Sequence, residues 1–356
     1  IISCLAFGVS VGSKAQSANS FDSFPMLDAY YDEDMPSNQE SFWSGCRIFL
    51  ITIGEGEPLY SWFGHTALLV ESPNNPSYMF DYGTFSFDAD NFYSNFIMGR
   101  LWFCCNASYG DYELSYLGTT GRKVSKVELN LTAPQKKAII SFLGMNSETD
   151  NRTYLYHHYK DNCATRVRDI ISYATDGGFE VWAKAKDGLS FRDRASGALS
   201  RNRFVQWALE FLQSGQIDGK ATAWDEMFLP ELLERYVLEY GLETGLVSQD
   251  GYELIYEETL KSAGGNGAEP RPNYVFSVSL GLALAIIAFV LLWFSQKPAV
   301  LRTYRIYSFA VDLVLGIFGS VLFFMMFFTN HNVTWYNENL LFVNPLLLVV
   351  AIKSLG

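Results

Sequence analysis

Two long apolar runs near the C-terminus constrain the fold of this chain more than any other feature of its sequence. Tyr274–Phe294 carries no charged residue, and Tyr307–Phe328 carries only Asp312. A helix needs about 20 apolar residues to cross the roughly 30 Å of hydrocarbon in a bilayer. A third apolar run, Leu340–Ile352, is shorter than a span requires. We therefore predict a transmembrane domain over residues 274–356, with at least two spans and a truncated third.

The charges between these runs predict the orientation of the chain in the membrane. The link after the first run contains Lys297, Arg302 and Arg305 and no acid. The link at Thr329–Asn339 has no Lys or Arg. Because short cytoplasmic loops are rich in Lys and Arg, the first link is predicted to be cytoplasmic. The part of the chain before the first span then lies on the opposite side of the membrane.

The overall charge excludes some classes of partner. The chain has 38 Asp and Glu against 26 Lys and Arg, which gives a net charge of −12. No basic stripe is available to neutralise phosphates, so nucleic-acid binding is not expected. Docking on anionic lipid through a polybasic patch is not expected either. Membrane attachment is therefore predicted to come from the apolar runs.

The N-terminal part divides into a targeting segment and a soluble domain. Ile1–Val11 is typical of the apolar core of a secretory signal, and Ser13–Gln16 offers a small-residue cleavage site. Lipid attachment at Cys4 is an alternative. The predicted segments are a signal remnant at 1–16, an acidic and loosely ordered leader at 17–44, a catalytic domain at 45–262 and a linker at 263–273.

Periodicity predicts a mixed fold for the soluble part. Short runs of β-branched and aromatic residues alternate with turn residues, and later segments have apolar residues at helical spacing. The predicted strands are Arg47–Ile53, Thr66–Val70, Tyr78–Tyr82 and Val124–Leu131. The predicted helices begin at the capping box Thr132–Gln135, at Cys163, near Phe204 and near Leu229. The class is α+β, followed by a helical membrane domain.

Cys163 is the strongest candidate for a catalytic residue. Val167, Ile170, Ile171 and Ala174 form one apolar helical face after it, and Asp161 or Asn162 can cap the helix. The sulfur then lies in the first turn, where backbone N–H groups and the helix dipole favour the nucleophilic thiolate. The alternative is a buried structural thiol.

His65 is the candidate base, because it lies at the start of a predicted strand beside Gly64. A cysteine paired with a histidine is the usual arrangement for acyl transfer, and the two need not be close in sequence. His65 could instead be an ordinary histidine at a strand end. His157 and His158 are much closer to Cys163 in the sequence.

The other cysteines predict no metal site. The sequence has no CxxC pair and no HExxH, so zinc is not expected. In an oxidising compartment, Cys46, Cys104 and Cys105 could supply one disulfide, with the pairing left open. No cofactor is predicted.

The loop between the last two apolar runs has two interpretations. His331, Trp335 and Asn339 are predicted to lie on the same side of the membrane as the soluble domain. They can form an interfacial aromatic belt with polar neighbours. They can also form a platform that presents a lipid head group to Cys163.

Three stretches together resemble a known family. Ser61–Leu68 (SWFGHTAL), Phe80–Phe85 (FDYGTF) and Asp161–Asp169 (DNCATRVRD) resemble the periplasmic domain of Lnb-type proteins, which act as lipoprotein N-acyltransferases in Bacteroides-like bacteria. Phe228–Pro230 and His331–Pro345 are similar to later parts of that family. The order of histidine strand and cysteine helix also resembles the circularly permuted papain-like fold, related to NlpC-type hydrolases.

The resemblance implies a role for each site residue. Cys163 would be the nucleophile and His65 its base. Permuted relatives place a polar residue on the next strand to orient the base, and here Asp81 and Tyr82 are the candidates. Arg166, Asn162 and Ser61 would contribute to substrate binding or to the oxyanion hole, with His331, Trp335 and Asn339 on the membrane side.

The implied reaction has two steps. The Cys163 thiolate takes an acyl chain from a membrane phospholipid, and the amine of a diacylglyceryl-cysteine lipoprotein then accepts it. The alternatives are a membrane-tethered cysteine peptidase or amidase that acts on cell-wall peptides, and a non-catalytic escort that binds lipid or lipoprotein. A wall hydrolase rarely needs several spans, whereas a lipid acyltransferase benefits from them.

Overall fold

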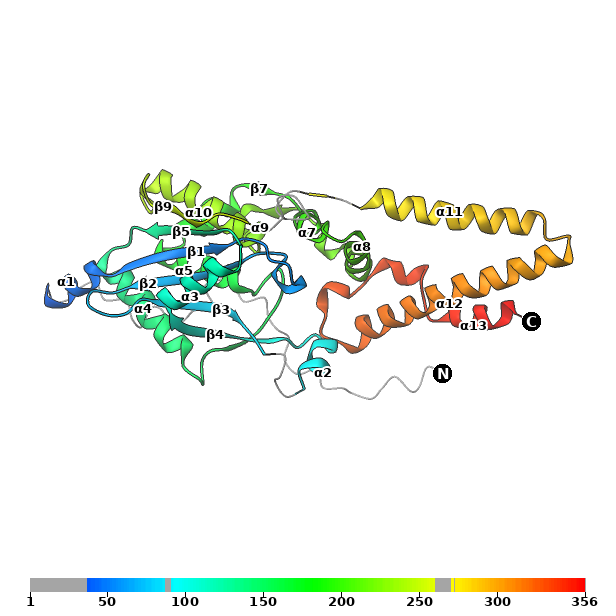
Figure 1. Cartoon of the computed structure of the whole chain (residues 1–356), viewed down its shortest axis with the longest axis horizontal. Coiled ribbons are helices and arrows are strands. Elements are labelled where there is room, and N and C mark those ends of the chain that lie inside the picture. The colour runs from blue at the N-terminus through cyan, green and yellow to red at the C-terminus, as the bar shows by residue number, and fades with distance from the viewer. Residues whose placement is uncertain (1–36, 87–90, 260–269, 272, 356) are drawn as a thin grey trace.

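The computed structural model describes residues 37–86, 91–259, 270–271 and 273–355 (Figure 1). A mixed domain built on one large sheet comes first, and helices α11, α12 and α13 project from it. The prediction of an α+β domain followed by a helical membrane domain is confirmed. The predicted signal remnant, most of the leader and most of the linker lie outside the described residues.

The main sheet has seven antiparallel strands in the order β6-β4-β3-β2-β1-β5-β9. Its centre consists of strands that the sequence predicts, whereas β4, β6 and β9 were not predicted. The bounds are β1 Arg47–Ile53, β2 His65–Glu71, β3 Tyr78–Thr84, β4 Trp102–Tyr109, β5 Val124–Leu129, β6 Thr153–Leu155 and β9 Tyr252–Tyr256. A second, two-stranded sheet pairs β7 Asp187–Gly188 with β8 Ala221–Thr222.

Helices cover both faces of the large sheet (Figure 1). Helices α4, α5, α8 and α10 begin at or next to the predicted positions, and the other helices of this domain were not predicted. The bounds are α1 Ser37–Gly45, α2 Phe92–Ile97, α3 Gly110–Thr119, α4 Ala133–Ser147, α5 Cys163–Ala174, α6 Gly178–Lys184, α7 Phe191–Leu199, α8 Arg203–Leu212, α9 Ala223–Glu226 and α10 Pro230–Thr244. The predicted capping box of Thr132 and Gln135 opens α4.

Strand alternation divides the core between the two faces of the sheet. On one face, Leu50, Leu68 and Val127 pack against the apolar sides of α4, α5 and α10. On the other face, Phe49 and Ile51 belong to a smaller cluster beneath α3. Helix α5 is therefore held against the centre of the sheet, and its first residue, Cys163, lies near the start of β2.

Two predictions, one about the leader and one about a disulfide, are wrong. Residues 37–44 of the predicted loose leader belong to helix α1, which is tied to α4 where Lys136 Nζ donates to the Ser44 carbonyl at 3.1 Å. The predicted disulfide is absent from the described residues, because Cys46, Cys104 and Cys105 are all free. Cys46 interacts with Ser72, far from β4, and consecutive strand residues such as Cys104 and Cys105 point to opposite faces.

The membrane part begins with two long apolar helices. α11 spans Tyr274–Trp293, and α12 spans Pro298–Phe328. Both are long and apolar enough to cross a bilayer. α12 begins before the predicted run, because Pro298 suits a first helical position and the basic link continues into the helix.

The third apolar run is helical only over α13, Leu346–Ser354. It packs closely on α12 at two glycines. A Cβ added to Gly316 would lie 2.7 Å from Leu348 Cδ2, and one added to Gly319 would lie 2.5 Å from the backbone nitrogen of Asn344. Small residues allow this close approach of backbones in membrane helices.

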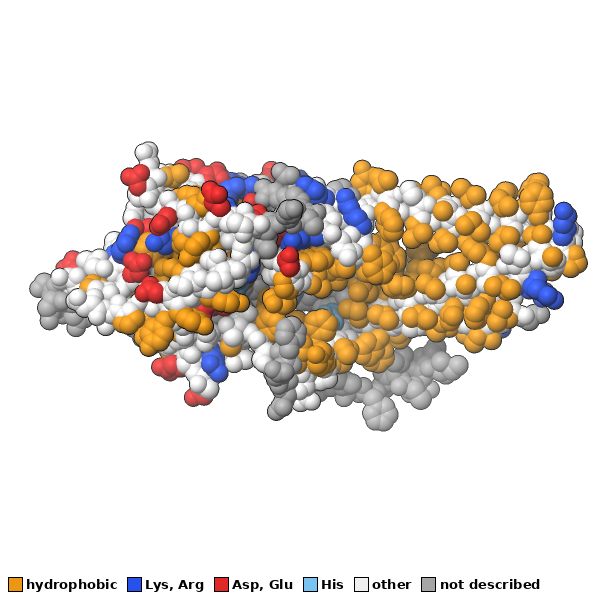
Figure 2. All heavy atoms as spheres, in the orientation of Figure 1, with side chains coloured by type: hydrophobic (Ala, Val, Ile, Leu, Met, Phe, Trp, Pro, Cys, Tyr) orange, Lys and Arg blue, Asp and Glu red, His pale blue; other side chains and the backbone are white. Residues whose placement is uncertain are grey.

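The loop after α12 joins the membrane part to the soluble domain. Asn330 N donates to the Met98 carbonyl at 2.8 Å, and Ser214 N donates to the Val333 carbonyl at 2.8 Å. Figure 2 shows apolar side chains over the projecting helices, with charged ones on the soluble domain and at the distant end of the helical hairpin. The soluble domain therefore lies at one membrane surface, and the basic link lies at the other.

Candidate active site

Cys163 is the first residue of α5, and a complete cap fixes its position. The Asn162 side-chain oxygen accepts from the backbone N–H groups of Ala164 and Thr165, each at 2.9 Å. Thr165 Oγ1 in turn accepts from Asn162 N at 2.8 Å. The cap leaves the N–H of Cys163 outside the intrahelical bonds, as expected for a first helical residue. The sulfur lies at the positive end of the helix dipole.

Asn162 is a structural cap rather than a substrate contact. Its Nδ2 donates to the carbonyls of His158 at 2.8 Å and Phe228 at 2.9 Å, while its oxygen accepts two bonds. All four hydrogen-bonding positions of the amide are thus occupied, and the side chain is buried. The amide of Asn162 therefore has no free hydrogen-bonding position for a ligand in this structure.

His65 is the first residue of β2 and is presented by a tight turn. Gly64 has φ of +74°, and a Cβ there would lie 3.0 Å from the Ile53 carbonyl oxygen. A left-handed conformation with so little space favours glycine. The turn directs His65 toward β3, where Gly83 leaves room for the ring. A Cβ on Gly83 would lie 2.3 Å from His65 Cε1.

Asp81 orients His65. Nε2 of His65 donates to Asp81 Oδ1 at 2.6 Å, and the two strands are paired at Ala67 and Asp81. Asp81 is itself fixed, since Gly83 N donates to Oδ1 at 2.6 Å and Thr84 Oγ1 to Oδ2 at 3.4 Å. With Nε2 engaged, Nδ1 is the ring nitrogen left for Cys163.

The electrostatics of the three groups favour an ion pair. Burial by itself lowers the pKa of His65, but the charges of Asp81 and Cys163, and hydrogen bonds to both, raise it well above its ordinary value. Burial likewise opposes ionisation of Asp81, yet the His65 charge brings the pKa of that carboxyl below its usual range. The contact with Asp81 therefore stabilises the imidazolium form of His65.

Tyr82, the other candidate for the orienting group, faces away from His65. Consecutive residues of β3 point to opposite faces, so Tyr82 enters the core with 0% exposure. Its hydroxyl donates to Asn146 Oδ1 at 2.8 Å. Of the two candidates, Asp81 is the one that contacts His65.

Arg166 and Ser61 are also engaged elsewhere. Arg166 donates from Nε and Nη2 to the two Asp161 oxygens at 2.7 and 2.9 Å, and its guanidinium lies 3.9 Å from the ring centroid of Tyr154. Ser61 is buried and donates to the Pro58 carbonyl at 2.7 Å within a turn. Through these contacts both side chains hold the segments around the site.

The three membrane-side candidates lie in the loop that joins the two parts. His331 Nε2 donates to the Phe96 carbonyl at 3.1 Å, and Asn339 Nδ2 donates to the Phe211 carbonyl at 3.0 Å. The Trp335 carbonyl accepts from Gln216 Nε2 at 2.7 Å. The loop that carries them is a docking loop, since its side chains and backbone contact α2, α8 and the segment after α8.

His157 is a connecting residue that the sequence analysis did not single out. Its Nε2 donates to Asn332 Oδ1 at 2.8 Å, while Nδ1 accepts from the backbone of Tyr159 and Lys160. Burial lowers the pKa of His157, which is consistent with a neutral ring. It ties the segment before Cys163 directly to the docking loop. The adjacent histidine pair was the available signal, but only the fold reveals the partner.

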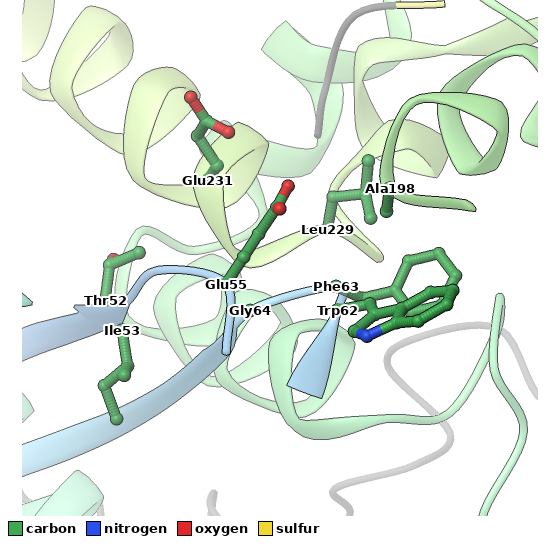
Figure 3. Close-up of a pocket in the computed structure, with 9 residues that line it drawn as sticks. All are labelled: Thr52, Ile53, Glu55, Trp62, Phe63, Gly64, Ala198, Leu229 and Glu231. Carbon is green, nitrogen blue, oxygen red and sulfur yellow. The ribbon is translucent and has the colours of Figure 1, made fainter. Parts of the chain in front are cut away.

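A small pocket lies beside the catalytic turn (Figure 3). The carboxylates of Glu55 and Glu231 lie on one side of it and the rings of Trp62 and Phe63 on the other. The lining residues are Thr52, Ile53, Glu55, Trp62, Phe63, Gly64, Ala198, Leu229 and Glu231. Cys163 and His65 do not line it, so the pocket adjoins the site without containing it. Among the described residues, no group of His, Cys, Asp and Glu could hold a metal ion.

Two family models match the chain. The Lnb N-terminal periplasmic domain matches residues 39–195, and the Lnb transmembrane domain matches residues 272–355. The chain belongs to the Lnb family. It is therefore an inner-membrane protein of a lipoprotein-processing family, with its N-terminal domain in the periplasm, as the loop charges predicted. Cys163, His65 and Asp81 all fall within the first match. No curated protein and no solved structure matches the chain.

Proposed function

We propose that this protein is a lipoprotein N-acyltransferase that moves an acyl chain from a phospholipid, through a Cys163 thioester, to the N-terminal amine of a diacylglyceryl-cysteine lipoprotein. The observation that carries the proposal is the set formed by Cys163, His65 and Asp81 on a domain docked to membrane spans. A cysteine, a base and a group that orients the base form the usual machinery for covalent acyl transfer.

In the first step, the Cys163 sulfur attacks the ester carbonyl of the phospholipid. The carbon–sulfur bond forms and the ester carbon–oxygen bond breaks. His65, which holds the thiol proton, gives it to the departing alkoxide, so that a lysophospholipid leaves. The backbone N–H of Cys163 is placed to stabilise the oxyanion that develops on the carbonyl oxygen.

In the second step, the free amine of the lipoprotein attacks the thioester. The carbon–nitrogen bond forms and the carbon–sulfur bond breaks. One amine proton passes to His65, which restores the imidazolium and thiolate. Asp81 keeps the ring in one orientation through both steps and stabilises its positive charge.

The location of the site supports lipid substrates. The docking loop contacts α2 through His331 and, through Asn332, the His157 segment that precedes α5 in the chain. On α2, Tyr93 is 71% exposed, Phe96 52% and Ile97 55%. An exposed apolar patch next to a span suits contact with lipid rather than with water. Both proposed substrates are confined to that surface, so tethering raises their effective concentration at the site.

The test is mass spectrometry of the purified full chain in detergent with a phospholipid and a synthetic diacylglyceryl-cysteine peptide. The proposal expects an acyl adduct on Cys163 without acceptor, and an N-acylated peptide once acceptor is added. Cleavage of a wall peptide, with no transfer to the amine, would instead identify a peptidase. Binding of the lipopeptide without any adduct would identify an escort.

A further inference from the structure

Arg122 and His65 lie at the same end of the central strands β1, β2 and β5. Ile53 at the end of β1 is paired with His65 on one side and with Val124 on the other. Residues paired across a sheet point to the same face, so these three side chains form one row. Arg122 comes two positions before Val124, in the turn that leads into β5. Its long side chain therefore starts close to the row that contains the base.

The guanidinium of Arg122 is incompletely satisfied. Nε donates to the Gly54 carbonyl at 2.8 Å. Nη2 is buried and has no hydrogen-bond partner among the residues that the structure describes. A buried donor without a partner costs free energy, and the cost is larger for a charged group.

Other arginines of the same domain form ion pairs with carboxylates. Arg166 pairs with Asp161, Arg168 with Asp169 and Arg201 with Glu55. No carboxylate of the described chain lies within ion-pair distance of Arg122. Its pKa is lowered by burial and raised by the nearby Tyr60, Cys163 and Tyr116. Arg122 is therefore a partly buried cation near Cys163, and it has no acidic partner among the residues that the structure describes.

We propose that Arg122 binds the phosphodiester of the acyl donor while the ester carbonyl lies at Cys163. This inference rests on the proposed acyltransferase function and adds the group that recognises the donor. A phosphate supplies the acceptor oxygens that Nη2 lacks, and arginine matches phosphate with two parallel hydrogen bonds. In a phospholipid, the glycerol backbone separates the phosphate from the ester carbonyls. A cation that lies near the sulfur without touching it therefore fits this ligand.

The proposed role of Arg122 also distinguishes the acyl donor from the acyl acceptor. The acyl donor is anionic at its phosphate, whereas the diacylglyceryl group of the acceptor carries no phosphate. Arg122 would then favour the donor in the first step and have no ligand in the second. The nearby Leu59 and Tyr60 are 52% and 65% exposed, which leaves an apolar rim for chains on the same side.

The experiment is a two-by-two cycle of protein and donor. Dihexanoylphosphatidylglycerol and dihexanoylglycerol carry the same esters and differ in the phosphate head group. The rate of Cys163 thioester formation is followed by intact-protein mass spectrometry for the full-length wild type, Arg122→Gln and Arg122→Lys. Arg47→Gln, at the other end of β1, is the matched control.

With the phosphate donor, Arg122→Gln is expected to lose about 10- to 100-fold in kcat/KM, mostly as a higher KM, and Arg122→Lys to lose less. With dihexanoylglycerol the loss is expected to stay below about threefold, so the coupling between Arg122 and the phosphate is about tenfold or more. Arg47→Gln should match the wild type. Equal losses with both donors would assign Arg122 to the oxyanion or to folding and overturn the proposal, as would no loss with either donor.

Binding without chemistry distinguishes this inference from the proposed function. In a Cys163→Ser background, calorimetric titration should show that Arg122→Gln weakens binding of the phosphate lipid about tenfold and leaves binding of dihexanoylglycerol unchanged. A wild type that forms no thioester would refute the acyltransferase, whatever this titration shows. Equal affinity of the two Cys163→Ser proteins for the phosphate lipid would refute the role of Arg122 alone.

Discussion

The soluble domain and the membrane helices are both rich in large apolar side chains, but they use them in opposite ways. Phe49 and Leu68 in the sheet are each 1% exposed. On α11, Val275 is 64% exposed, Ile286 61% and Phe289 62%. In water an apolar surface must be covered by the protein, whereas in a bilayer the lipid covers it. The comparison shows that the same residue types mark a core in one region and a lipid-facing surface in the other.

The polar contacts are also unevenly distributed over the two regions. They are dense around Cys163 and at the docking loop, where the two regions meet, and the candidate site lies at this junction. An enzyme that takes both substrates from the bilayer surface needs a water-exposed nucleophile close to lipid. Five predictions test this division, beginning with the largest expected effect.

Cys163→Ala should abolish acyl transfer, with a loss of at least about 10⁴-fold, because no other group can form the thioester. The thermal midpoint of the soluble domain should change little, since the side chain lies at a helix start and only partly contacts the core. Mass spectrometry of the lipopeptide product and circular dichroism make the two measurements. N-acylation that persists in this variant would exclude the thioester mechanism.

Asp81→Asn should lower kcat by about 10²- to 10⁴-fold with little change in KM, because the ring loses its anionic partner. Thr84→Val is the matched control, since Thr84 touches only the other Asp81 oxygen, at 3.4 Å. Its loss should be below about tenfold. Wild-type kcat in Asp81→Asn would show that the strand alone orients His65.

Asn162→Ala should lower the free energy of unfolding of the soluble domain by about 3 kcal/mol. The substitution leaves two carbonyls and two N–H groups without the amide that satisfies them. Chemical denaturation measures the change. Asn202→Ala, which removes the cap of the less buried α8, is the control and should lose about 1 kcal/mol. Equal losses would mean that burial adds nothing to the cap.

Asn332→Ala should weaken acyl transfer from a membrane donor more than acyl transfer from a soluble donor. It removes the acceptor for His157, so the soluble domain should sit less firmly on the membrane part. Transfer from vesicle phospholipid should fall about tenfold, while acylation by a soluble short-chain ester stays within about twofold. Asn75→Ala, in the turn before β3, is the control and should affect neither. Equal losses with both donors would argue that the loop shapes the site itself.

The smallest effect concerns pH. His65 has a raised pKa in the folded state, so its contribution to stability is fully present below about pH 6.5 and is lost as the pH rises through the folded pKa. Asp81 has a lowered pKa, so its contribution is present above about pH 4 and is lost as the pH falls through the folded value. Between these limits Asp81→Asn should lower the unfolding free energy by about 1 kcal/mol, and the difference should shrink as the pH rises through the folded pKa of His65. A difference that does not vary with pH would exclude the ion pair.

The central strands and the capped helices could be predicted from the sequence because their signals are local. The apolar alternation of β1 and the Thr132–Gln135 box depend on neighbours in the chain, and both elements are found where predicted. The edge strands β6 and β9 were missed, because they are short and are held by pairing rather than by their own pattern.

Cys163, His65 and the membrane runs were singled out from the sequence, because a thiol after a capping residue, a histidine at the start of a strand and a long apolar run each have a physical meaning on their own. Only the tertiary structure decided between Asp81 and Tyr82, since strand pairing determines which side chain faces His65. It also determined that the side chains of Asn162 and Arg166 have their partners and that Nη2 of Arg122 has none among the described residues, because the fold brings together hydrogen-bond partners that are far apart in sequence.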